Sequence, residues 1–148
     1  MEENKKVIVT EEFTVSKSLL WEVITQHSHQ INWFFSNIPS FELEVGYQLL
    51  FDVETPNRVF PHFWKVLAIQ PQKSFTLLWE YQGYDGSSEV CFSIDSISEN
   101  LSRLTLTHTV TDPFNQDIEE FRYESCLGGW NYFIKENLKQ YVDRLVIK

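Results

Sequence analysis

The feature that most limits what this chain can fold into is a long apolar stripe near its carboxyl end. The stripe residues step by three and four positions: Leu127, Trp130, Ile134, Leu138, Tyr141 and Leu145. This spacing predicts one helix of about five turns with a single apolar face. Such a helix must cover a broad apolar surface, which the rest of the chain has to supply.

Strands precede this helix along most of the chain. Val7, Val9, Phe13 and Val15 fall on one side of a period-two pattern, which predicts a first strand over residues 6–15. Turn residues separate the strand-forming runs that follow, at 41–45, 47–54, 59–69, 74–81, 88–97 and 101–110. The short connections between these runs indicate an antiparallel meander.

Two short helices are expected between the first strand and the meander. Ser16 can cap the first of them, and apolar residues continue from Leu20 to Ile31 across a break near His27 to His29. The chain therefore belongs to the α+β class, and we expect a curved antiparallel sheet of six to seven strands wrapped around the terminal helix. The length of 148 residues fits one domain over residues 1–148.

Gly128 and Gly129 lie inside the predicted terminal helix, where each costs about 1 kcal/mol relative to alanine. On a helical wheel with Trp130 facing the sheet, both glycines fall to the flank and back of the helix. Either a neighbouring segment packs closely against the bare backbone, or the helix breaks at Gly128 and restarts near Trp130. We favour a bend or break, because adjacent glycines add their costs.

Charge and composition argue against several classes of partner. The chain has 12 basic and 21 acidic residues and a formal net charge of -9, which makes nucleic acid a poor partner. No apolar run has the length of a membrane span or a signal peptide, so we expect a cytoplasmic protein without membrane insertion. Cys91 and Cys126 lack metal-binding and disulfide spacing, and we expect both to be buried free thiols.

Five stretches, in order along the chain, resemble the Bet v 1-like or START-like superfamily, and most closely the family related to the carboxyl-terminal domain of the activator of Hsp90 ATPase. They are SKSLLWEVITQHSHQINWF at 16–34, FELEVGYQLLFDV at 41–53, VFPHFWKVLAIQPQKSFTLLWEY at 59–81, RLTLTHTV at 103–110 and GGWNYFIKENLKQY at 128–141. The resemblance implies the helix-grip fold. It also implies a cavity between sheet and terminal helix, since many members of the superfamily hold apolar molecules there.

The walls of such a cavity would be the inward-facing side chains of the strands. Alternation places His62 with Trp64, Trp79 with Tyr81, and His108 on an otherwise apolar strand face. We predict that nine residues contact a ligand: Trp33, Phe51, His62, Trp64, Trp79, Tyr81, His108, Trp130 and Ile134. The four tryptophans among them either line the cavity or fill core volume.

His108 is the strongest candidate for a polar group that contacts a ligand, and two interpretations of it remain open. Its imidazole either orients a ligand by hydrogen bonding, or is a core histidine whose nitrogens are satisfied by protein partners, which is the commoner case. The same two interpretations apply to His62.

No motif in the chain predicts a reaction. The sequence contains none of the standard motifs for a nucleophile elbow, a zinc protease, a dinucleotide site, a phosphate-binding loop or a cysteine pair, and we assign no catalytic residue, metal ligand or cofactor. Three function classes remain. We favour a binding protein for an apolar small molecule. The alternatives are a module that binds a chaperone or another protein, and a cyclase-like enzyme with His108 or Tyr81 as acid or base.

Overall fold

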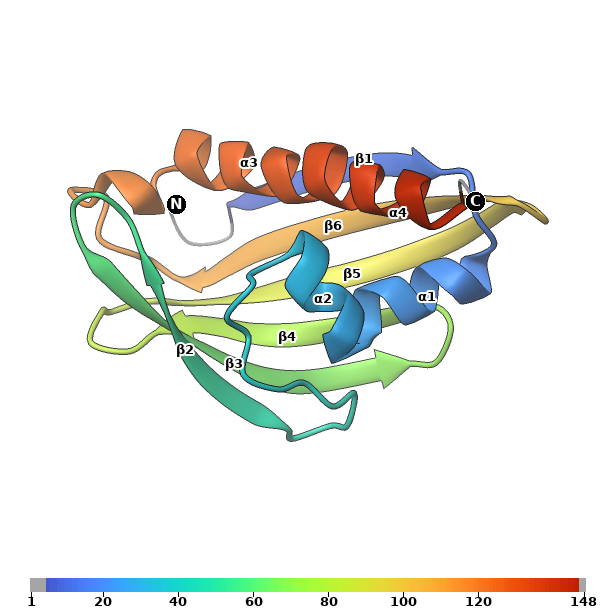
Figure 1. The fold of residues 1–148 in the computed structure, drawn as a ribbon. Helices are drawn as coiled ribbons and strands as arrows, with labels where there is room; N and C mark the ends of the chain where they lie inside the picture. The colour runs from blue at the N-terminus through green and yellow to red at the C-terminus, as the bar shows by residue number, and fades with distance from the viewer. Residues whose placement is uncertain (1–4, 147–148) are drawn as a thin grey trace.

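The computed structural model describes residues 5–146, which form a curved sheet with a helical layer on one face (Figure 1). Its strands are antiparallel and lie in the order β1-β6-β5-β4-β3-β2. Their bounds are β1 (Lys6–Phe13), β2 (Gln48–Glu54), β3 (Val59–Gln70), β4 (Ser74–Tyr81), β5 (Ser87–Ser98) and β6 (Leu101–Asp112). The predicted α+β class and helix-grip architecture are confirmed.

The helices belong to two groups. Ser16 begins the first group by accepting a hydrogen bond from the Leu19 N–H at 3.1 Å, and α1 (Lys17–Thr25) and α2 (His27–Trp33) follow. The second group closes the chain: a 3₁₀ turn η1 (Glu119–Phe121), α3 (Tyr123–Asn131), a π-helical segment η2 (Tyr132–Leu138) and α4 (Lys139–Val146). Figure 1 shows the long terminal helix running beside β1 and β6. None of the described helices has the length and apolarity that crossing a membrane requires.

Residues 41–45, which we expected to form a strand, are irregular. The alternation of Phe41 and Leu43 with acidic residues imitates a strand because Phe41 is buried, with its ring centroid 6.2 Å from that of Phe75. The backbone turns instead, and the Tyr47 N–H donates to the Glu44 carbonyl at 3.0 Å. Within residues 5–146 no strand pairs with this segment, so an alternating pattern alone does not make a strand here.

The terminal helix runs through Gly128 and Gly129 without a break, so the predicted bend or break is wrong. The Tyr132 N–H donates to the carbonyl groups of both glycines, which carries the hydrogen-bonded ladder past them. A Cβ atom on either glycine would meet no atom of another segment within 4 Å, which also excludes close packing by a neighbour. Packing of the apolar face therefore outweighs the low helix propensity of the glycines.

The π-helical segment decides which helix residues face the sheet. The buried positions recur every four residues: Trp130, Ile134, Leu138 and Val142. In a regular α-helix each interval of four passes a full turn by about 40°, and this stripe would drift off the sheet. The wider i→i+5 turn of η2 reduces that drift. Tyr141 and Leu145, which we predicted in the stripe, are only half-buried as a result. Leu127, also predicted in the stripe, is half-buried too, but it precedes η2.

One end of the sheet's inward face is packed mainly by apolar side chains. Phe75 and Phe92 stack with ring centroids 4.7 Å apart, and Trp21 of α1 meets Phe75 edge-on at 6.0 Å. Ile94 and Leu104 beside them are fully buried. We call this region the closed end and define it by Trp21, Phe75, Phe92, Ile94 and Leu104.

Candidate functional site

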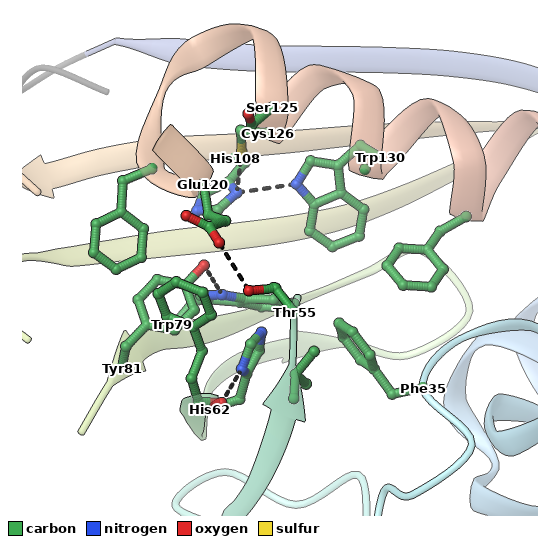
Figure 2. A pocket seen from close by; sticks show the side chains of 15 residues that line it. Phe35, Thr55, His62, Trp79, Tyr81, His108, Glu120, Ser125, Cys126 and Trp130 are labelled. Atoms are coloured by element: carbon green, nitrogen blue, oxygen red, sulfur yellow. Dashed lines mark hydrogen bonds between the residues drawn. The ribbon is translucent and has the colours of Figure 1, made fainter. Parts of the chain in front are cut away.

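A pocket of about 230 Å³ lies at the opposite end of the same sheet face, beneath η1 and the first turns of α3. It is partly open to solvent, and Figure 2 shows its side chains converging from the sheet and the helix. We call this region the open end. Its lining residues are Phe35, Val53, Thr55, Phe60, His62, Trp79, Tyr81, His108, Glu120, Phe121, Ser125, Cys126, Gly129, Trp130 and Phe133.

The nine predicted site residues divide between the pocket and the core around it. Five line the pocket, because every second side chain of β3, β4 and β6 points inward and α3 adds a tryptophan: His62, Trp79, Tyr81, His108 and Trp130. Four are buried outside its lining: Trp33, Phe51, Trp64 and Ile134. A role in ligand contact stays a prediction for all nine.

The four residues outside the lining fill volume behind the pocket wall. The Trp33 indole N–H donates to the Val23 carbonyl at 3.0 Å, which fixes its ring in the core. Trp64 packs on Trp79 with centroids 4.9 Å apart, and among residues 5–146 its indole nitrogen has no hydrogen-bond acceptor. Phe51 lies against His62 with centroids 5.4 Å apart. The contacts of Trp64 and Phe51 support the wall from outside.

Both ring nitrogens of His108 are satisfied by protein groups. The Trp130 indole N–H donates to Nδ1 at 3.0 Å, which places the proton of the neutral ring on Nε2. Nε2–H donates to Ser88 Oγ at 2.8 Å, and that hydroxyl donates to the Trp79 carbonyl at 2.7 Å. Burial lowers the pKa of His108 to about 3, so the ring is neutral at pH 7. These contacts favour the interpretation of His108 as a satisfied core histidine.

Cys126 lies next to His108 but is not an activated nucleophile. Its sulfur is 3.4 Å from His108 Nδ1, the nitrogen that already accepts from Trp130. Burial raises the pKa of the Cys126 thiol to about 12, so the reactive thiolate is scarce at neutral pH. Cys126 and Cys91 are free thiols as expected, but both are half-buried rather than buried.

His62 keeps one nitrogen free of protein partners. Nδ1–H donates to the Phe60 carbonyl at 2.9 Å, which leaves the lone pair of the neutral ring on Nε2. Figure 2 shows this second nitrogen pointing into the pocket, and no described residue pairs with it. Burial lowers the pKa of His62 to about 4, although the carbonyl partner favours the charged form. The ring therefore offers a hydrogen-bond acceptor at pH 7.

Tyr81 complements His62 with a hydrogen-bond donor. Its hydroxyl oxygen accepts from the Trp79 indole N–H at 2.9 Å and keeps its own proton. Burial raises the pKa of Tyr81, so this proton stays in place at neutral pH. No described residue accepts it.

Sequence reasoning missed the polar rim of the pocket. The Thr55 hydroxyl donates to Glu120 Oε2 at 2.8 Å, and Arg58 Nε lies 3.5 Å from Oε1. Burial raises the pKa of Glu120, but the hydrogen bond from Thr55 and the Arg58 charge outweigh it and hold that pKa below the usual value. In the sequence, Glu119, Glu120 and Glu124 indicate only the start of a helix. Both partners of Glu120 lie in an irregular hairpin tip, which carries no periodic signal.

Gly129 also lines the pocket, which the helical wheel did not predict. Gly128, its neighbour, is not part of the lining. A Cβ atom at either position would enter open space. The missing side chain of Gly129 therefore leaves volume in the pocket, whereas that of Gly128 does not.

Comparison with protein families identifies the group to which this fold belongs. Residues 14–143 match the model of the family described as "Activator of Hsp90 ATPase homolog 1-like protein". The chain belongs to this family. The resemblance noted from the sequence is thereby confirmed. A search of curated proteins gave no match.

Solved structures share the fold of this family member at low sequence identity. Protein MLL2253 from Mesorhizobium loti has a TM-score of 0.73 and 21% identity, covering 95% of this chain and 98% of that chain. An Hsp90 activator from Plasmodium falciparum, PFC0360w, has a TM-score of 0.68 and 20% identity, covering 88% and 91%. The Aha1 dimer from Colwellia psychrerythraea has a TM-score of 0.69 and 16% identity, covering 93% and 96%. At these identities the likeness concerns the fold.

The open end of this family member has both apolar and polar groups on its surface. It combines aromatic walls with a free acceptor on His62, a free donor on Tyr81 and a paired carboxylate on Glu120. Among residues 5–146 no cluster of histidine, cysteine or acidic side chains has the arrangement of a metal site. Aromatic walls with a few convergent polar groups are typical of pockets that recognise a molecule by shape and hydrogen bonding.

Proposed function

We propose that this protein binds a small, mainly aromatic molecule in the pocket at the open end. The observation that carries the proposal is a partly open pocket of about 230 Å³ whose lining is mostly aromatic. That volume exceeds the roughly 150 Å³ of an apolar cavity that accepts benzene. It is below the range of roughly 300–1,000 Å³ typical of pockets for drug-sized ligands. A ligand with one ring or two fused rings fits between these limits.

The rigidity of the pocket walls supports this proposal. Trp79 and Trp130 meet edge-on with centroids 5.3 Å apart. The Trp130 indole N–H donates to His108 Nδ1, and the Trp79 indole N–H donates to the Tyr81 hydroxyl, so a hydrogen bond holds each ring. Phe35 and Phe133 meet edge-on at 4.8 Å on another side. Walls that are ordered before binding lower the entropic cost of holding a ligand. Flat rings gain further from offset and edge-on contacts with such walls.

The two glycines provide a matched test. In Gly129→Leu the new side chain occupies the pocket, while in Gly128→Leu it points to open space outside the lining. Neither glycine has a positive φ, so both variants keep the helix and gain about 0.5–1 kcal/mol of stability from helix propensity. We expect Gly129→Leu to abolish ligand binding and Gly128→Leu to leave it unchanged.

Binding is measured by native mass spectrometry of protein purified from its own host, followed by thermal-shift assays with monocyclic and bicyclic aromatic compounds. The expected result is a retained adduct, or a stabilising compound, that Gly128→Leu keeps and Gly129→Leu loses. Equal binding by both variants would place the ligand elsewhere. Absence of any adduct and of any stabilising compound would reject the proposal.

A second candidate function is binding to a chaperone. It is favoured by the family match and by the structural likeness to an Hsp90 activator from Plasmodium falciparum. A chaperone partner would require a cytoplasmic location, with which the free thiols Cys91 and Cys126 are consistent. Pull-down with purified Hsp90 tests this candidate. Capture that Gly129→Leu leaves intact would separate it from ligand binding.

A further inference from the structure

We propose that the ligand carries a neutral hydroxyl group on its aromatic ring, and that His62 and Tyr81 hold this group between them. The inference rests on the proposed function, because it names the chemistry of a molecule bound in the same pocket. It is carried by two polar atoms that protein partners leave available, one acceptor and one donor, side by side in an aromatic wall.

The acceptor is His62 Nε2. The hydrogen bond from Nδ1–H to the Phe60 carbonyl fixes the tautomer, so Nε2 carries a lone pair and no proton. The side chain is only 6% exposed, and the free nitrogen points into the pocket. Nε2 is accessible from the pocket, so a ligand that donates to it can take the place of water.

The donor is the Tyr81 hydroxyl. Its oxygen already accepts from Trp79, which orients the group and leaves the proton for a further partner. The Trp79 indole cannot accept a hydrogen bond in return, since it is only a donor. The proton of Tyr81 is therefore available to an oxygen of the ligand.

One ligand group can satisfy both atoms. His62 and Tyr81 are register partners on β3 and β4, with ring centroids 4.8 Å apart. A hydroxyl donates one hydrogen bond and accepts others, so it pairs with both. An ether or ketone lacks the donor for His62, and an ammonium group lacks the acceptor for Tyr81.

The charge around the pocket favours a neutral group over a carboxylate. The described lining contains no lysine or arginine, and the two histidines in it are neutral at pH 7. The nearest charge in that lining is the Glu120 carboxylate, and the chain has a net charge of -9. The cation at the rim, Arg58, already pairs with Glu120, so a carboxylate ligand would lose its hydration and compete with Glu120 for that partner.

Three bicyclic probes separate these requirements by equilibrium dialysis at pH 7: 2-naphthol, 2-naphthoate and naphthalene. We expect 2-naphthol to bind about tenfold more tightly than 2-naphthoate or better. The hydroxyl of 2-naphthol can donate to His62, whereas 2-naphthoate would have to bury its charge. Binding of 2-naphthoate as tight as that of 2-naphthol would overturn the inference while leaving the pocket's function standing. Failure of all three probes would instead count against the proposed function.

Variants at His62 test whether its Nε2 accepts a hydrogen bond from the ligand. In His62→Asn the amide can keep the hydrogen bond to the Phe60 carbonyl but lacks an atom at the place of Nε2, whereas the longer His62→Gln returns an acceptor there. We expect His62→Asn to weaken 2-naphthol binding about tenfold, His62→Gln to restore part of it, and naphthalene binding to change little in either. Equal losses for 2-naphthol and naphthalene would mean that His62 acts only as part of the wall, and would overturn its role.

Tyr81→Phe tests the donor in the same assay. We expect it to weaken binding of 2-naphthol about tenfold while naphthalene binding persists. The variant also removes the acceptor of the Trp79 indole N–H, so thermal unfolding is measured alongside. The comparison of wild-type binding to 2-naphthol and 2-naphthoate needs no variant and decides the inference even where Tyr81→Phe is unstable. Unchanged 2-naphthol binding by folded Tyr81→Phe would remove Tyr81 from the site.

Discussion

The closed end and the open end lie on the same sheet face and obey the same alternation, yet they differ in content. On β4 the inward face begins with Phe75 at the closed end and finishes with Tyr81 at the open end; on β6 it passes from Leu104 to His108. The closed end stacks ring on ring, while the open end keeps about 230 Å³ and several polar atoms. One continuous core thus contains a tightly packed region at one end and a pocket with polar groups at the other.

The largest expected effect tests the stabilising role of the closed end. Phe92→Ala removes a fully buried ring that stacks on Phe75, and we expect it to lower the free energy of unfolding by about 3–5 kcal/mol. Phe133→Ala, at the half-buried pocket wall, serves as the control and should cost about 1–2 kcal/mol. Urea unfolding followed by tryptophan fluorescence measures both. Equal losses would erase the contrast between the two ends.

Low pH should destabilise the fold through the open end, because both buried histidines lie there. Burial lowers the pKa of His62 to about 4 and that of His108 to about 3, from 6.5 in both cases. Below pH 6.5 these two histidines therefore bind protons in the unfolded chain but stay neutral in the folded chain. Stability from these groups is complete above pH 6.5 and is lost as the pH falls towards 4 and then 3.

The size of this acid effect follows from linkage. Each histidine contributes up to about 1.4 kcal/mol per pH unit, so we expect a loss of about 3–4 kcal/mol between pH 7 and pH 5. Urea unfolding at the two pH values measures it, above the range where most carboxylates titrate. His62→Asn should lose about half as much as the wild type. A variant with the full wild-type loss would show that His62 does not contribute.

A smaller effect tests the hydrogen bond between helix and sheet at the open end. Trp130→Phe removes the N–H that donates to His108 Nδ1, while Trp64→Phe removes a buried N–H for which the described residues offer no acceptor. Both variants lose the same ring volume. We expect Trp130→Phe to cost about 1 kcal/mol more than Trp64→Phe in urea unfolding. Equal costs would mean that the bond to His108 adds nothing net.

The strands and their inward faces could be predicted from the sequence because alternation is a local property. Period-two spacing alone predicts that His62, Trp79, Tyr81 and His108 face inward, and these residues meet in one pocket. The same rule failed at 41–45, where Phe41 packs against Phe75 of β4 although no described strand pairs with its backbone. Alternation reports which side chains face inward, and it does not report whether a partner strand is present.

The rest of the site depends on geometry that has no sequence period. Thr55 lies in a hairpin tip and Glu120 in a single 3₁₀ turn, so nothing in their spacing places them at one pocket rim. The helical wheel places Gly129 away from the sheet, yet Gly129 lines the pocket. A wheel shows the direction of each side chain and not the open space beside the helix, so it could not predict this position. The stripe error at Tyr141 has a related cause, since the wheel assumes 3.6 residues per turn throughout.

The π-helical segment allows the terminal helix to hold one residue more than a regular α-helix would need over the same length. Hydrogen bonds of the i→i+5 type accommodate an additional residue, so deleting one position within Tyr132–Leu138 would return the helix to ordinary geometry. The downstream side chains would keep their directions: Val142 would stay against the sheet, and Tyr141 would keep the 2.6 Å hydrogen bond that joins it to His29 of α2. A deletion in an adjoining α-helical turn has no such reserve, and it would rotate everything downstream by about 100°.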